Sequence, residues 1–299
     1  EQGTASSESM PHEATIFKSE PLRKDEDGDG RADIAYDQNG QVITSAGNHG
    51  MTAATVVAKV ADTLVRAGST FREDKKEAYR RAIASEELTR AKWNLETILE
   101  NAEVAQCNRS PLCDDTGIPH VFIEIGPNRT LSGSMMTAIQ EGVLEGLRQL
   151  PGRPMAIMGD DAARIDMSGG ISPDSDALVP APFLIKEVEE DVLRVHVLML
   201  GGGPAIRGIT HRVFHKHSLQ VVLDEIVTRT KDATKLLGCT PCAVAVGVGR
   251  SQYEATALMM EAMVYGDFNK QNEMERYITD KVNETDVGPL GLNGKTTVL

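Results

Sequence analysis

The sequence predicts an α/β fold (mixed α+β) in which mixed sheets are flanked by helices. Apolar residues recur at spacings of three and four in some segments, which indicates helices, and alternate with other residues in others, which indicates strands. The two kinds of segment follow one another along the 299 residues. We expect helices at about 51–68, 74–102, 135–150 and 219–237 and a further one that contains 255–263, and strands at 34–36, 41–43, 121–125, 193–199 and 243–248.

The first 50 residues are rich in Ser, Asp, Gly and Asn, and we interpret 1–50 as an atypical N-terminal extension of a domain at 51–299. Within the extension, Asp25–Asp33 resembles the first part of a calcium loop, with oxygens at alternate positions and Gly at the turn. The twelfth position, where such a loop has a bidentate Glu, is Tyr36. We therefore prefer a solvated acidic turn between two short strands and keep Ca²⁺ as the alternative.

The next two segments are predicted to be amphipathic helices. In the first, apolar residues from Val56 to Val65 share one face, and Gly68 is a candidate for the residue that ends the helix. In the second, Glu, Lys and Arg are interspersed on the solvated face. Its candidate core residues are Ala78, Ile83, Leu88, Trp93, Leu95 and Ile98.

A loop with reactive side chains follows the second helix. It contains Cys113, Asp114, Asp115 and Thr116, and Gly117 and a strand come directly after it. A loop held by a rigid strand is a common location for a functional site. The alternative is a polar turn before a hairpin, with Cys113 as a small buried apolar residue.

The central part of the chain carries two glycine-containing segments. After a helix that ends near Leu150, residues 154–185 show little periodicity and are predicted to be loop, including a tight turn at 166–170. The strand at 193–199 runs into Gly201–Gly203, where backbone N–H groups would be able to approach an anion closely. The pattern is not G-x-G-x-x-G, which excludes the dinucleotide fingerprint.

The C-terminal third contains three further patterns. His211 and His215 would share a face of a helix, as zinc ligands do, but no carboxylate completes a zinc motif, and we prefer a basic surface turn. Cys239 and Cys242 form a C-x-x-C before the predicted strand at 243–248. Residues 294–297 (Gly-Lys-Thr-Thr) look like the end of a P-loop, but the position of its first glycine is a proline and no strand precedes it, which argues against a nucleotide site.

Composition excludes several classes of partner. The net charge of −13 and the single Trp disfavour nucleic acid and anionic membranes. No apolar run approaches the roughly 20 residues of a membrane helix. Four cysteines are too few for a disulfide scaffold in a chain of this length and indicate metal binding or catalysis in a reducing compartment, so we expect a cytoplasmic protein.

Four motifs in order resemble the iron–sulfur hydro-lyases, the family of class I fumarate hydratases and the alpha subunit of L-tartrate dehydratase. The resemblance covers about 53–299 and rests on Pro111–Gly117, Gly201–Gly203, Cys239–Gly249 and Gly288–Thr297. It implies reversible addition or removal of water across a C–C bond of a small dicarboxylate, fumarate/malate or tartrate. It also implies a [4Fe–4S] cluster on three cysteines, with an open iron as Lewis acid.

The resemblance assigns roles residue by residue. Cys113 is the first cluster ligand. The spacing of the family would place the second ligand at Pro241, which is not a cysteine. A shift of two residues, to Cys239, preserves the alternation of the following strand, whereas a shift of one, to Cys242, inverts it, so we favour Cys239 and keep Cys242 in reserve. Asp115 is the catalytic aspartate beside the cluster, and the substrate-binding residues are Asp114, Arg153 and Gly202.

The chain also departs from the family pattern. Asp114 stands in place of a substrate-binding Gln, and Pro204 and Leu200 change the wall of the pocket. The family's third cysteine and its beta part have no counterpart in 51–299, so we expect a beta subunit or swivelling domain as partner, and a homo- or hetero-oligomer. Two alternatives remain open, a non-catalytic homologue that binds a partner and a C-x-x-C redox protein.

Overall fold

The computed structural model describes residues 52–113, 115, 117–150, 181–201 and 208–299, together with the backbone of 35–36 and 42–44. Its sheet has five strands in the order β1-β2-β5-β3-β4. Only β3 and β4 pair in parallel, and the other pairs are antiparallel. The predicted mixed α/β fold is confirmed. The strands are β1 (Ala35–Tyr36), β2 (Val42–Thr44), β3 (Ile118–Ile125), β4 (Leu184–Glu187) and β5 (Leu193–Leu200).

Five of the described helices begin at a capping side chain. Thr52, Ser132, Ser218, Ser251 and Asn272 each accept a hydrogen bond from a backbone N–H in the first helical turn. The described helices are α1 (Ala53–Ser69), α2 (Glu73–Ser85), α3 (Thr89–Asn108), α4 (Gly133–Gln149), α7 (Leu219–Thr234), α8 (Gln252–Tyr265), α9 (Glu273–Asn283) and the short 3₁₀ helix η3 (Pro289–Gly291).

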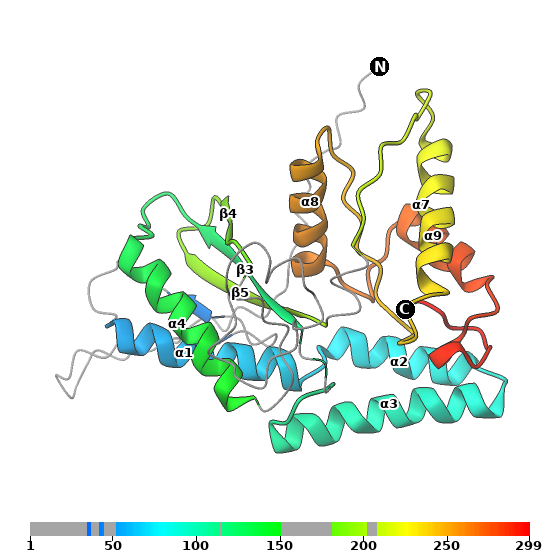
Figure 1. Cartoon of the computed structure of the whole chain (residues 1–299), viewed down its shortest axis with the longest axis horizontal. Helices are drawn as coiled ribbons and strands as arrows, with labels where there is room; N and C mark the ends of the chain where they lie inside the picture. The colour runs from blue at the N-terminus through cyan, green and yellow to red at the C-terminus, as the bar shows by residue number, and fades with distance from the viewer. Residues whose placement is uncertain are drawn as a thin grey trace, which may run out of the picture.

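The main core lies between the sheet and the pair α1 and α4, which cross beneath it (Figure 1). Two glycines of α4 allow this close crossing. A Cβ at Gly142 would lie 2.6 Å from the Cβ of Val60, and one at Gly146 would lie 2.8 Å from the Cβ of Leu64. The buried apolar residues of this core include Val56, Val60, Leu64, Val121, Ile123, Ile139, Val143, Leu193, Val195 and Val197.

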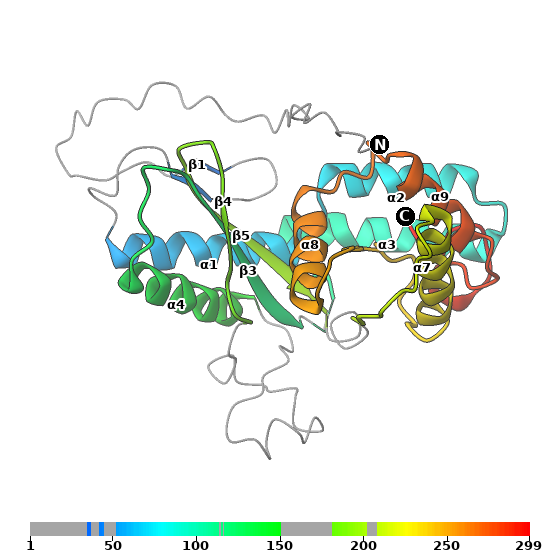
Figure 2. The same ribbon diagram turned by 90° about the horizontal axis from the view of Figure 1, so that it is seen from above.

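A second part of the molecule is built on the hairpin of α2 and α3. In Figure 1, α8 stands between the sheet and the pair α7 and α9, and the same arrangement is seen from above in Figure 2. The C-terminal residue Leu299 packs against a small core that includes Tyr79, Ala82 and Leu95. The chain therefore closes onto the α2–α3 hairpin.

Three predictions about the helices were wrong. The single helix expected at 74–102 is two helices, because the Glu86 side chain accepts hydrogen bonds from the backbone N–H groups of Glu87 and Leu88 at 3.0 Å and starts a new helix there. Leu88 and Trp93, expected in the core, are 45% and 63% exposed. Gly68 does not end α1, which continues to Ser69.

Two predictions about strands also need correction. Residues 243–248, expected to form a strand, have an alternating apolar sequence but do not form one. Leu184 and Ile185, at the end of the segment expected to be loop, belong to β4, which pairs with Phe122–Ile125 at the edge of the sheet. The reason is that a strand requires a partner as well as a pattern: β4 has one in β3, whereas 243–248 has none among the described strands.

Candidate functional site

The loop that carries Cys113 is fixed by two helices. Arg109 adopts the left-handed conformation that ends α3, with φ of 50°. The backbone N–H of Leu112 donates to the carbonyl of Gly68 in α1 at 2.9 Å, and the Asn101 side chain donates to the carbonyl of Leu112 at 3.0 Å. The exposed thiol of Cys113 follows directly on this anchored backbone.

The same loop ends at Gly117, which contacts the first residue of the triple glycine. Gly117 has φ of +68°, and a Cβ there would overlap the carbonyl oxygen of Leu200 and lie 2.5 Å from the Cα of Gly201. The register of β3 and β5 pairs Ile118 with Leu200. Only glycine fits this position, and the structure brings the Cys-Asp-Asp loop next to the start of the glycine run.

The C-x-x-C loop docks on the C-terminal segment. The Thr240 hydroxyl donates to the carbonyl of Gly288 at 2.5 Å, and the N–H of Leu290 donates to the carbonyl of Thr240 at 2.9 Å. The Cys242 backbone pairs in parallel with Val298. The third and fourth sequence motifs, separated by about 50 residues, are therefore in direct contact.

The two cysteines of this loop have different surroundings. Cys239 is exposed. Cys242 is half-buried, and burial raises the pKa of its thiol to about 11. The neighbouring Lys75 also lies in a poorly solvated place, since burial lowers the pKa of its ammonium group to about 8. Cys239 is thus the more accessible thiol for a metal.

The two cysteine loops each contact one side of the junction between α1 and α2. Leu112 binds the backbone of Gly68 at the end of α1, and the thiol of Cys242 interacts electrostatically with Lys75 at the start of α2. In the described part of the chain, however, no three His, Cys, Asp or Glu side chains gather closely enough to hold a metal ion. Thiolates suit an iron–sulfur cluster, but the described residues alone do not complete its ligand set.

The predicted site residues are placed only in part. Asp115 lies half-buried between Cys113 and Gly117. Asp114, Arg153 and Gly202 fall outside the described residues, and so does the candidate calcium loop Asp25–Asp33.

The last motif has a structural role. The side chain of Lys295 pairs with Glu87 at 2.5 Å, and its backbone N–H donates to the Glu86 carboxylate at 2.7 Å. Thr297 is fully buried, and its hydroxyl accepts from the backbone N–H of Gly288 at 3.0 Å. These contacts explain the Gly-Lys-Thr-Thr sequence without a nucleotide.

The histidine segment is an exposed turn. His211 and His215 lie in a stretch without helix, so they do not share a helix face. The ring Nδ1 of His215 accepts a hydrogen bond from the backbone N–H of His217 at 2.9 Å. This agrees with the predicted surface turn.

A buried polar network was not anticipated from the sequence. The carboxylate of Glu124, which is 2% exposed in β3, binds Arg194, His196 and Tyr265, with 3.0 Å to Nε2 of His196. Burial raises the pKa of Glu124, but these partners outweigh it and lower the pKa to about 2. The sequence does contain a signal for this network, because Glu124 is a charged residue inside an otherwise apolar strand. Because Tyr265 ends α8, the network fastens this helix to the sheet.

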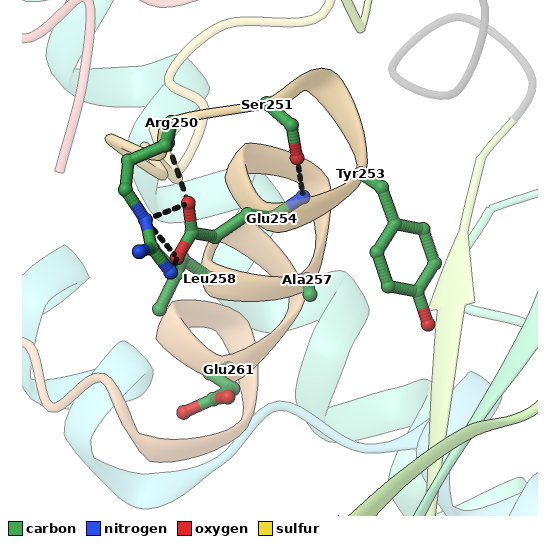
Figure 3. A pocket seen from close by; sticks show the side chains of 7 residues that line it. All are labelled: Arg250, Ser251, Tyr253, Glu254, Ala257, Leu258 and Glu261. Atoms are coloured by element: carbon green, nitrogen blue, oxygen red, sulfur yellow. Dashed lines mark hydrogen bonds and ion pairs between the residues drawn. The ribbon is translucent and has the colours of Figure 1, made fainter.

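A shallow groove of about 620 Å³ runs along the exposed side of α8. Figure 3 shows the ion pair of Arg250 and Glu254 at its upper end and the Tyr253 ring pointing away from the helix. The groove is lined by α8 and the residues just before it, and it includes none of the cysteine or glycine motifs.

Comparison with known proteins identifies the class to which this fold and these motifs belong, the hydro-lyases. Residues 57–299 match the family described as fumarate hydratase (Fumerase), and the chain belongs to this family.

Its relatives are distant. A protein of Methanocaldococcus jannaschii assigned as L(+)-tartrate dehydratase subunit alpha is 26% identical over 254 residues, which cover 81% of this chain and 86% of the relative. L(+)-tartrate dehydratase subunit alpha of Escherichia coli K12 is 23% identical, over 68% of this chain and 66% of the relative. A protein of Geobacillus stearothermophilus assigned as fumarate hydratase class I is 25% identical, over 71% of this chain and 42% of the relative. The chain thus spans less than half of the Geobacillus protein.

The helices in the described ranges are all too short or too polar to cross a membrane.

Proposed function

We propose that this chain is the alpha subunit or alpha part of an iron–sulfur hydro-lyase. The reaction is the reversible hydration or dehydration of a small dicarboxylate, fumarate/malate or tartrate. The contact between Gly117 and Gly201 supports this most directly, because it brings the Cys-Asp-Asp loop and the triple glycine to one place. The family and the names of the relatives point to the same reaction class.

We assign Cys113 and Cys239 as ligands of a [4Fe–4S] cluster and keep Cys242 in reserve. Both assigned thiols are exposed on loops anchored by backbone hydrogen bonds, which leaves them accessible to iron. The half-buried Cys242 is less suited to this role. When bound, the cluster supplies a Lewis-acid iron for the hydroxyl group that leaves or adds.

The chain's own residues then bind and orient the substrate. The Asp115 carboxylate exchanges a proton beside the substrate hydroxyl. Arg153 binds a substrate carboxylate through its planar guanidinium group, and the backbone of Gly202 approaches the same ligand. Asp114 contacts the substrate as well, and its negative charge next to a dianion favours a substrate with an additional hydroxyl, as in tartrate, over fumarate.

We further propose a beta subunit or swivelling domain as partner, because relatives from two organisms are named as alpha subunits. A homo- or hetero-oligomer of alpha and beta parts follows from this. The cytoplasm is the proposed compartment, since the four cysteines are all unpaired.

The test is an anaerobic assay of the chain co-expressed with a beta partner, with fumarate and with tartrate as substrates. We expect water addition or removal with one of them, and a loss of at least about 100-fold in kcat for Asp115→Asn. Asp232→Asn, which removes an exposed charge on α7, is the matched control. Equal activity of the two variants would exclude Asp115 as the catalytic residue, and no turnover of either substrate by a cluster-loaded complex would reject the dicarboxylate assignment.

A further inference from the structure

The sheet has a second face, opposite the main core, and α8 closes one end of it. On β3 this face carries His120, Phe122 and Glu124, which alternate with residues of the main core. The ring centroid of Tyr265 in α8 lies 6.0 Å from that of Phe122, and the Tyr265 hydroxyl donates to the Glu124 carboxylate. Phe122 and Glu124 are buried at this closed end of the face.

The other end of the same face lies beside the contact between the Cys-Asp-Asp loop and the glycine run. The pair of Ile118 and Leu200 comes first, directly after Gly117, and the pair of His120 and Leu198 follows two residues further along β3. All four paired side chains are half-buried, so this end is less completely covered. Since a strand rises about 3.4 Å per residue, His120 lies roughly 7 Å along β3 from Ile118.

The imidazole ring of His120 is turned back toward the beginning of β3. Its Nδ1 lies 3.0 Å from the carbonyl oxygen of Ile118. Because a carbonyl oxygen only accepts, Nδ1 carries the proton of the neutral ring, and Nε2 keeps a free lone pair. Burial lowers the pKa of His120, which favours this neutral form. Within the described ranges, no residue forms a hydrogen bond with Nε2.

This end of the face therefore combines apolar side chains with one hydrogen-bond acceptor. A neutral imidazole nitrogen accepts a hydrogen bond from a hydroxyl group, whereas an ionised carboxylate has no proton to donate to it. The neighbouring side chains of Ile118, Leu198 and Leu200 are apolar, so a hydroxyl group placed against them has His120 as its described partner. In such surroundings a polar group without a partner is costly, and a single hydrogen bond discriminates between similar ligands.

We propose that His120 is a specificity-determining residue whose Nε2 accepts a hydrogen bond from the second hydroxyl group of tartrate. This inference rests on the proposed hydro-lyase function, because it requires a dicarboxylate bound beside Asp115 and the glycine run. Tartrate and malate share two carboxylates and one hydroxyl group, and they differ only in the hydroxyl group that is assigned to His120. The inference therefore selects the more hydroxylated of the candidate substrates.

The test compares tartrate and malate in the cluster-loaded complex of the full chain with its beta partner, kept without oxygen. Each ligand is measured through KM where it is turned over and through Ki where it only inhibits. We expect His120→Phe, which keeps a ring but removes the acceptor, to weaken tartrate binding at least about fivefold and to leave malate binding unchanged. His120→Gln, whose amide oxygen accepts, should restore part of the preference. His211→Phe, which changes an exposed histidine in the same way, is the control and should behave like the wild type.

The failure of this inference is distinguishable from the failure of the proposed reaction. Equal weakening of both ligands in His120→Phe, or unchanged affinity for both, would overturn the role of His120 and leave the reaction intact. If the complex turns over neither substrate, nitrogen NMR of isotope-labelled histidine side chains decides instead. A shift of the His120 Nε2 signal with tartrate but not with malate would support the role of His120 without the reaction, and the absence of this shift would overturn it.

Discussion

The backbone N–H of Lys295 donates a 2.7 Å hydrogen bond to the carboxylate of Glu86, which is buried at the turn between α2 and α3. The same carboxylate accepts from the N–H groups of Glu87 and Leu88. One side chain thus starts α3 and fixes the C-terminal segment on which the C-x-x-C loop rests.

Replacing Glu86 should therefore destabilise the whole second part of the molecule. We expect Glu86→Ala to lower the free energy of unfolding by about 2–4 kcal/mol, because three backbone N–H groups lose a charged acceptor. Urea denaturation followed by circular dichroism measures this change. Glu87→Ala, which removes only the exposed partner of the Lys295 side chain, is the control and should leave the unfolding midpoint nearly unchanged. Equal effects of the two substitutions would contradict this account.

The Glu124 network predicts an acid transition. The pKa of Glu124 is about 2 in the folded protein and near 4.5 when unperturbed. A depressed carboxyl pKa stabilises the fold above the unperturbed value, and this stabilisation is lost as the pH falls from about 4.5 through 2. Unfolding measured over this range should show a steeper loss of stability for the wild type than for Glu124→Gln. The exposed control Glu96→Gln on α3 should keep the wild-type slope, and a Glu124→Gln slope identical to wild type would disprove the assignment.

Gly117 is the position where the site tolerates least change. Gly117→Ala forces a side chain into a left-handed backbone and against the carbonyl of Leu200, and we expect a loss of about 2–4 kcal/mol in unfolding free energy. Thermal unfolding provides the measurement. Gly133→Ala is the matched control, because a Cβ there meets nothing within 4 Å and α4 begins at that residue. A neutral Gly117→Ala would show that the two loops do not touch as described.

The two cysteines of the C-x-x-C should differ in reactivity. In the cluster-free protein, iodoacetamide at pH 8 should alkylate the exposed Cys239 at least about tenfold faster than the half-buried Cys242, whose thiol is mostly protonated at that pH. Mass spectrometry of timed digests gives both rates in one sample, and the exposed Cys107 provides an internal reference. Faster labelling of Cys242 would reverse the choice of ligand.

The sequence was sufficient for the elements whose pattern and packing agree. The periodicity of α1 and α4 and the alternation of β3 and β5 predicted these elements because each buries one face in a single core. Glu86 and Trp93 show where this fails. Nothing local indicates that the Glu86 side chain will turn back onto the backbone, and an apolar Trp at helical spacing is not thereby buried.

The site was predictable to a similar extent. The motifs could be found in the sequence, but the contacts between them could not. The contact of Gly117 with Gly201 depends on the register of two distant strands. The choice between Cys239 and Cys242 depended on the alternation of a strand at 243–248, which is not formed in the described structure. The choice of Cys239 is supported instead by the different exposure of the two thiols.

The most direct test of the central claim is the iron and acid-labile sulfide content of the chain in complex with its beta partner, reconstituted without oxygen in the wild type and in Cys113→Ser, Cys239→Ser and Cys242→Ser. We predict about four of each per wild-type chain, a loss in Cys113→Ser and Cys239→Ser, and retention in Cys242→Ser. Wild-type protein that binds no iron in complex with its beta partner, or a Cys113→Ser variant that keeps the full cluster, would contradict the assignment of this chain as an iron–sulfur hydro-lyase.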